Sequence, residues 1–116
     1  MISKSSLELF FKKILVIAEE NYDEFNSIDG QLGDGDLGIT ISKGLKEINE
    51  NLNKFEDDLS KIFLLCAQCF TKASSSSFGT LVAISFRTVA KQTKGKTNLD
   101  IDDLPSIINS VIQAVC

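Results

Sequence analysis

The sequence has no histidine and no tryptophan, and it holds one proline and three cysteines in 116 residues. Without histidine, the chain has no Ser-His-Asp or Cys-His nucleophile system and cannot act as a phosphohistidine carrier. The same absence, in a chain with a single C-x-x-C pair, nearly excludes a zinc site with four protein ligands. These three classes of site are therefore not expected.

Clusters of basic residues and long apolar runs are missing as well. The 12 lysines and arginines are scattered along a chain of net charge −4, a pattern that does not suggest binding to nucleic acid or to a membrane surface. No apolar run is long enough to span a bilayer, and the N-terminus lacks the layout of a signal peptide. We therefore expect no nucleic-acid partner, no membrane association and a cytoplasmic location.

The residues that are present indicate one globular domain. A chain of 116 residues with 43% hydrophobic residues is the size of one modest domain, residues 1–116, with a single core. Cys66 and Cys69 form the C-x-x-C pair inside an apolar helical pattern, which favours small buried core residues over a redox or metal pair.

Apolar residues spaced three and four apart predict an all-α fold with five helices. We expect helices over residues 7–25, over 38–52, from a cap at Asp57 or Asp58 to Ala73, over 78–91, and from Asp102 or Asp103 with Pro105 in the first turn. Residues 80–86 contain enough β-branched side chains for a buried strand, but the helical neighbours favour a helix. Loops are expected at residues 27–37, 74–77 and 93–101.

Residues 29–38, Asp-Gly-Gln-Leu-Gly-Asp-Gly-Asp-Leu-Gly, form the most distinctive stretch of the chain. The G-x-G-x-x-G within it matches the dinucleotide fingerprint literally, but that motif must follow a strand, and here a helix precedes it. An EF-hand fails because Ile39 and Leu45 stand where glycine and glutamate are required. A P-loop fails because no Gly-Lys-Ser/Thr occurs.

Three carboxylates remain, from Asp29, Asp34 and Asp36, just before a predicted helix. Such hard oxygen ligands suit Mg²⁺, which prefers a few carboxylates together with phosphate oxygens and water. The alternative interpretation is a solvated acidic turn that caps the next helix.

A second polar stretch, residues 72–80 (Lys-Ala-Ser-Ser-Ser-Ser-Phe-Gly-Thr), separates two apolar helical patterns. A turn so rich in hydroxyl and amide groups can donate hydrogen bonds to phosphate oxygens. Alternatively, it is an ordinary flexible connection between helices.

Together the two stretches resemble a known family. Residues 28–40, Ile-Asp-Gly-Gln-Leu-Gly-Asp-Gly-Asp-Leu-Gly-Ile-Thr, resemble the signature of the DhaL/DAK2 family, which comprises the nucleotide-binding subunit or domain of dihydroxyacetone kinases. Residues 74–80, which end in Phe-Gly-Thr, resemble the second, glycine- and serine-rich phosphate loop of that family. The order, spacing and helical context of the two stretches agree with the family.

The resemblance implies an up-and-down barrel of antiparallel helices with a nucleotide at one end. This chain would supply about five of the family's eight helices, so we expect a single DhaL/DAK2-like domain that is truncated at its C-terminus. An open barrel leaves apolar faces exposed, and such faces predict association with another chain or the formation of a homo-oligomer.

The family's site residues transfer position by position. Asp29, Asp34 and Asp36 match the aspartates that hold two Mg²⁺ ions. The residues that match those around the phosphates of ADP or ATP are Leu37, Gly38, Ile39, Thr40, Ala73 and Ser74. Leu37 stands where histidine or threonine is common, and Thr40 stands where asparagine is usual. Lys72 replaces a common glycine and is either an added phosphate contact or merely exposed.

The implied activity is phosphoryl transfer, with magnesium offsetting charge on the phosphates and with free N–H groups at the start of the helix near Gly38 adding partial positive charge. A dihydroxyacetone-type substrate would lie on a separate DhaK-type subunit or domain. The phosphate would come either from ATP or from a phosphotransferase-system phosphocarrier that rephosphorylates bound ADP. The alternative function is a non-catalytic helical binding module, or an incomplete fragment, that retains the metal loop.

Overall fold

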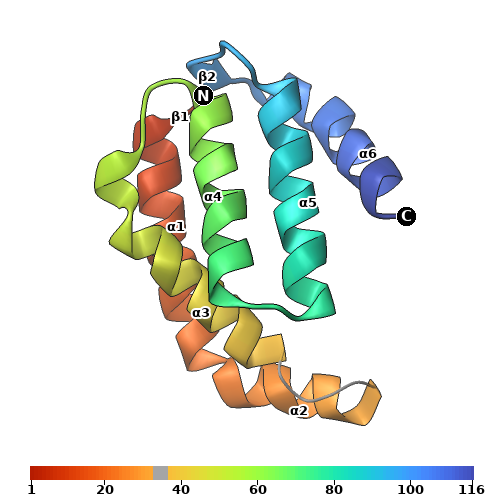
Figure 1. Cartoon of the computed structure of the whole chain (residues 1–116). Coiled ribbons are helices and arrows are strands. Elements are labelled where there is room, and N and C mark those ends of the chain that lie inside the picture. Colours follow the sequence, from red (N-terminus) through yellow and green to blue (C-terminus); the bar gives the residue numbers. More distant parts are fainter. Residues whose placement is uncertain (33–36) are drawn as a thin grey trace.

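The chain is all-α in a computed structural model. The model describes residues 1–32 and 37–116, and for residues 29, 31 and 32 it describes the backbone alone. The described residues form six α-helices, two short 3₁₀ turns and one pair of two-residue strands (Figure 1). In chain order these are β1 (Ile2–Ser3), α1 (Lys4–Glu20), α2 (Tyr22–Leu32), α3 (Leu37–Glu50), η1 (Leu52–Lys54), α4 (Leu59–Ala73), α5 (Ser77–Gln92), β2 (Asn98–Leu99), η2 (Ile101–Asp103) and α6 (Leu104–Val115).

Helices α4 and α5 run antiparallel, side by side, at the centre of the molecule (Figure 1). Helix α3 packs against α4, and α1 packs against α3, while α6 packs against the other side of α5. Helix α2 packs on α3, at the end of the molecule where α4 connects to α5 (Figure 1). Antiparallel pairing of Ile2 with Leu99 ties the N-terminus to the α5–α6 connection.

The core lies where α1, α3, α4 and α5 meet. Ile48, Leu59, Ile62 and Cys66 are fully buried, and the ring of Phe86 on α5 lies 5.8–6.4 Å, centre to centre, from the rings of Phe11, Phe63 and Phe70. Close packing of this kind supplies most of the stability of helices that would be marginal alone.

Cys66 and Cys69 are both buried free thiols. Burial raises the pKa of Cys66 far above its usual range and, with the charge of Glu47, raises the pKa of Cys69 to about 11. Both side chains are thus protonated at neutral pH and poorly reactive. The interpretation of the C-x-x-C pair as core residues is confirmed.

Several predicted elements are confirmed. Asp58 caps α4 by accepting a hydrogen bond of 3.0 Å from the Ser60 amide, and Pro105 lies in the first turn of α6. Residues 80–86 are helical, within α5. There the hydroxyls of Thr80 and Ser85 donate to the carbonyls four residues earlier, which is how such side chains are accommodated inside a helix.

Three predicted boundaries were wrong. The single helix over residues 7–25 is two helices, because α1 ends at Glu20, where the Asn21 side chain donates to the Ile17 carbonyl at 2.8 Å and terminates the helix. The loop expected from residue 27 is helical as far as Leu32, where α2 packs on α3. The loop over residues 93–101 contains β2, whose partner strand is almost a hundred residues away in sequence.

Candidate functional site

The start of α3 is held by a side chain from α2. The Oδ1 atom of Asn26 accepts hydrogen bonds from the amides of Gly38, at 2.7 Å, and Ile39, at 3.3 Å. A Cβ atom on Gly38 would lie 2.5 Å from the carbonyl oxygen of Tyr22 and 2.8 Å from Asn26 Oδ1. Only glycine therefore lets the two helices approach this closely without displacement of the backbone.

The α4–α5 turn, residues 73–76, is held by its own hydroxyls. Ser76 caps α5 by accepting a hydrogen bond of 3.0 Å from the Gly79 amide. Ser74 Oγ accepts from the Ser76 amide at 3.1 Å and donates to Ser76 Oγ at 2.9 Å. The serine-rich stretch is thus a turn held by hydrogen bonds among its own residues.

The two segments meet through Thr40. Its hydroxyl lies 3.1 Å from that of Ser76 and 3.4 Å from that of Ser74, although these residues are 36 and 34 positions apart in sequence. Beside this contact lies a cleft of about 400 Å³, here called the hydroxyl cleft, lined by Ile39, Thr40, Lys43, Ala73, Ser74, Ser75 and Ser76. The tertiary structure therefore joins the two stretches that the sequence singled out.

The predicted nucleotide-binding residues divide into two groups. Ile39, Thr40, Ala73 and Ser74 line the hydroxyl cleft. Gly38 is instead buried against α2, and Leu37 begins α3 as a half-buried residue.

The predicted metal ligands lie largely outside the described side chains. Asp34 and Asp36 lie outside the described residues, and Asp29 is described only as a backbone position in α2. Elsewhere in residues 1–32 and 37–116, no three acidic or cysteine side chains converge as metal ligands would. The assignment of Mg²⁺ to these aspartates therefore stays a prediction.

Two observations bear on positive charge in this region. The amides of Gly38 and Ile39 are not free at the start of α3, because Asn26 accepts from both. The Lys72 ammonium lies 2.9 Å from the Glu47 carboxylate, and this hydrogen bond and charge raise the pKa of Lys72. Lys72 lines a neighbouring hollow with Glu47 and Gln68, so it is paired with α3 instead of facing the hydroxyl cleft.

Sequence reasoning missed two residues of this region, Asn26 and Lys43, and it included Ser76 in the serine-rich stretch without assigning it as the cap of α5. Lys43 follows Ile39 by four positions on α3, so helical spacing alone puts both on one face. Ser76 stands three residues before Gly79, the usual spacing of an N-cap. No local pattern predicts Asn26, because its hydrogen bonds require α2 to dock on α3.

A second hollow, of about 420 Å³, is entirely apolar. It opens beside α1, where Phe10 and Ile17 remain 50% and 54% exposed. Its lining residues are Phe10, Phe11, Ile14, Ile17, Ala18, Phe25, Ile41, Leu45, Phe70 and Phe86. The predicted exposure of apolar faces is therefore found on this side of the helices. No described helix is both long and apolar enough to cross a membrane.

The chain is similar to known proteins over most of its length. The family model described as the DAK2 domain matches residues 31–116. Two curated proteins of Listeria innocua are similar to the chain, the ADP-binding subunits DhaL of PEP-dependent dihydroxyacetone kinase 2 and of PEP-dependent dihydroxyacetone kinase 1. The first is 26% identical over 91% of this chain and 52% of its own length. The second is 24% identical over 84% of this chain and 49% of its own length.

The chain thus spans about half the length of the curated relatives it matches. No solved structure gave a significant match.

Proposed function

The chain belongs to the DAK2 domain family, and on that basis we propose that it binds ADP with magnesium as the nucleotide-binding part of a dihydroxyacetone-kinase-like phosphotransferase. The observation that carries the proposal is the contact between Thr40 and the α4–α5 turn, with Ser76 at 3.1 Å. It brings the start of α3, which directly follows the acidic stretch, beside a turn of hydroxyl groups at the start of α5.

The hydroxyl cleft has the chemistry that a phosphate chain requires. The hydroxyls of Thr40, Ser74 and Ser76 can turn from one another to donate hydrogen bonds to phosphate oxygens. The first amides of a helix have no partner within the helix. At α5 the Gly79 amide donates to Ser76 Oγ, and Ser77 and Phe78 are the first two residues of the helix. Anions are stabilised at such a position by the helix dipole.

We assign the metal to Asp29, Asp34 and Asp36 by the chemistry of these donors. Three carboxylates supply hard oxygen ligands, and Mg²⁺ bound by a few carboxylates retains positions for phosphate oxygens. The two ions that the family resemblance implies would supply positive charge that offsets the charge of the phosphates. Asp29 follows Asn26 on α2 by three residues, so the helix that caps α3 also carries one of the proposed ligands.

The names of the relatives support a choice of nucleotide and phosphoryl donor. Both similar proteins are named as ADP-binding subunits of PEP-dependent kinases. We therefore propose ADP as the resident nucleotide, with a phosphocarrier of the phosphotransferase system as donor, in preference to ATP as a consumed co-substrate. A dihydroxyacetone-type acceptor would be held by a separate DhaK-type subunit or domain.

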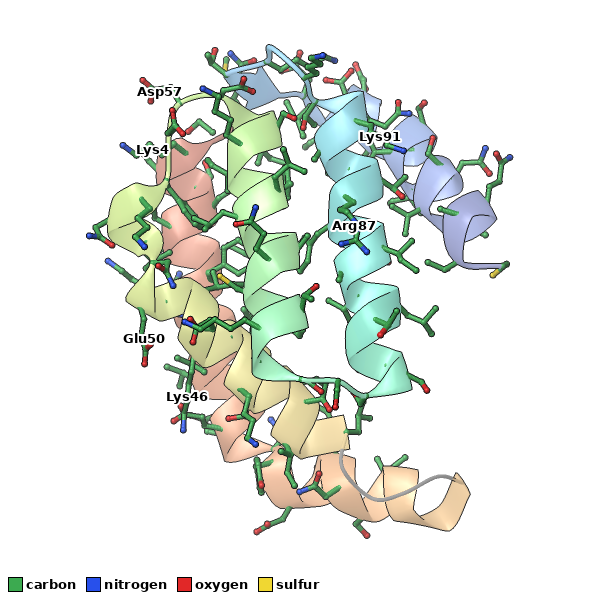
Figure 2. All side chains as sticks on the ribbon, in the orientation of Figure 1. Lys4, Lys46, Glu50, Asp57, Arg87 and Lys91 are labelled. Atoms are coloured by element: carbon green, nitrogen blue, oxygen red, sulfur yellow. The ribbon has the colours of Figure 1, made fainter. Side chains whose placement is uncertain are left out.

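The experiment is an ADP titration by calorimetry, with and without Mg²⁺, on the wild type and on a double variant with Asp34→Ala and Asp36→Ala. We expect binding only with magnesium, and none by the double variant, because the phosphates then lose their counter-charge. A matched control replaces Asp57 and Asp102 with alanine. This control removes the same charge from exposed positions. Figure 2 shows Asp57 beside the start of α4, far from the α4–α5 turn.

The outcomes separate the candidate functions. Magnesium-dependent binding that survives in the control but not in the double variant supports the nucleotide site. A folded wild type that binds no ADP contradicts it and favours the alternative, a helical binding module that keeps the metal loop without a competent site. The half-exposed apolar side chains of α1 are the observation in favour of that alternative.

A further inference from the structure

Lys43 places a positive charge at the hydroxyl cleft. It lies one helical turn after Ile39 on α3, its side chain is exposed, and it lines the cleft opposite residues 73–76. The other described residues of the lining are neutral: Ile39, Thr40, Ala73, Ser74, Ser75 and Ser76. Lys43 is thus the charged member of the described lining.

The other lysine near the turn is already paired. Lys72 lies 2.9 Å from Glu47, whose carboxylate is largely covered. The ion pairs found among the described residues are Lys72–Glu47 and Lys61–Glu56, and neither involves Lys43. Near the turn, Lys43 is therefore the cation whose charge is not already matched by a described carboxylate.

The cleft needs such a charge to hold a phosphate chain. Its hydroxyls are neutral donors, and α4 ends at Ala73, which adds the partial negative charge of a helix C-terminus. A lysine ammonium is a compact charge on a flexible stem, well suited to reach phosphate oxygens as a point charge.

We infer that Lys43 binds the phosphate chain of the nucleotide and makes the hydroxyl cleft select nucleoside diphosphates over monophosphates. This inference rests on the proposed function. Since a diphosphate carries more charge than a monophosphate, the loss of Lys43 weakens ADP binding more than AMP binding. The effect is one of charge, so arginine at this position retains it in large part.

The test compares Lys43→Gln, Lys43→Arg and Lys46→Gln by calorimetric titration with ADP and with AMP in the presence of Mg²⁺. Lys46 is the matched control: it is an exposed lysine of the same helix, and in Figure 2 its side chain projects away from the α4–α5 turn. We expect Lys43→Gln to weaken ADP binding about tenfold or more, the loss typical of one charge-assisted hydrogen bond. Lys43→Arg and Lys46→Gln should stay within about threefold of the wild type.

AMP provides the second readout. Lys43→Gln should change AMP affinity less than ADP affinity, whereas a merely structural effect of the substitution would weaken both alike. Thermal unfolding of each variant checks the fold, and substitutions at exposed positions such as these usually change stability by less than about 0.5 kcal/mol.

Each outcome decides the inference. If the wild type binds ADP and Lys43→Gln binds it equally well, the role of Lys43 is overturned but the proposed function stands. Equal losses in Lys43→Gln and Lys46→Gln also overturn it, because they would reflect the net charge of α3 rather than a contact in the cleft. A wild type that binds no nucleotide overturns the proposed function and this inference together.

Discussion

The two helix starts beside the hydroxyl cleft are stabilised by different means. At α5 the acceptor is Ser76, which precedes the Gly79 amide that it binds by three residues. At α3 the acceptor is Asn26, on another helix and 12 residues before Gly38. The start of α5 therefore depends on local sequence, whereas the start of α3 depends on the docking of α2. Anything that shifts α2 will disturb the half of the site that follows the acidic stretch.

The two helix starts should differ most in the stability lost when Gly38, at α3, or Gly79, at α5, is replaced by alanine. Gly38→Ala puts a Cβ atom 2.5 Å from the Tyr22 carbonyl oxygen, while in Gly79→Ala the nearest atoms lie at 3.3 Å. We expect Gly38→Ala to lower the free energy of unfolding by about 2 kcal/mol, the cost of forcing packed backbones apart. Gly79→Ala should stay within about 1 kcal/mol, because alanine favours the helix and offsets the tighter contact.

Urea unfolding of the two variants and the wild type measures this difference. Equal losses of stability for the two variants would show that α2 moves aside for a Cβ atom as easily as the α4–α5 turn does. The conclusion that the start of α3 depends more on the docking of α2 would then be wrong.

A smaller effect is expected from removal of each cap. Asn26→Ala and Ser76→Ala should each cost about 1 kcal/mol, the usual value of an N-cap side chain. Amide hydrogen exchange then locates the change. Asn26→Ala should accelerate exchange at Gly38 and Ile39 and leave Gly79 unchanged, and Ser76→Ala should do the opposite.

The conservative variant Asn26→Asp keeps an acceptor at the same place and adds a charge that a helix N-terminus favours. Its stability should match that of the wild type. Asn26→Ala removes both the acceptor oxygen and the side-chain NH2 group, whereas Asn26→Asp removes only the NH2 group, so it serves as the control. Rapid exchange at Gly38 in Asn26→Asp would contradict the assignment of Oδ1 as the cap.

An effect no larger than that of a cap should come from the hydroxyl that joins the two starts. Thr40 is 2% exposed, and Thr40→Val removes its hydrogen bonds at nearly constant volume. We expect a loss of about 1 kcal/mol, and Thr40→Ser should retain the bond to Ser76.

Unfolding of Thr40→Val, Ser76→Ala and the double variant forms a cycle that isolates the pair. We expect a coupling of about 0.5 kcal/mol or more, as for residues in direct contact. Strict additivity would mean that the hydroxyl contact contributes nothing to holding the starts together.

Much of the fold could be predicted from local patterns. Apolar spacing located the buried face of α4, and Asp58 and Pro105 marked the starts of α4 and α6. The break between α1 and α2 was missed because the apolar pattern continues through it. There the Asn21 side chain competes for a carbonyl of α1, and one more polar residue within the polar run 19–24 is a weak signal.

Local sequence was enough to predict the residue chemistry of this protein: an all-α chain without histidine, an acidic stretch before one helix and a hydroxyl-rich turn that caps another. Those features depend on neighbours a few positions apart, through helical periodicity and capping. Three contacts could not be predicted in this way: Thr40 meets Ser76, Asn26 accepts from the first amides of α3, and Lys43 rather than Lys72 lines the hydroxyl cleft. These contacts join residues 12 to 36 positions apart, and they form only when whole helices pack.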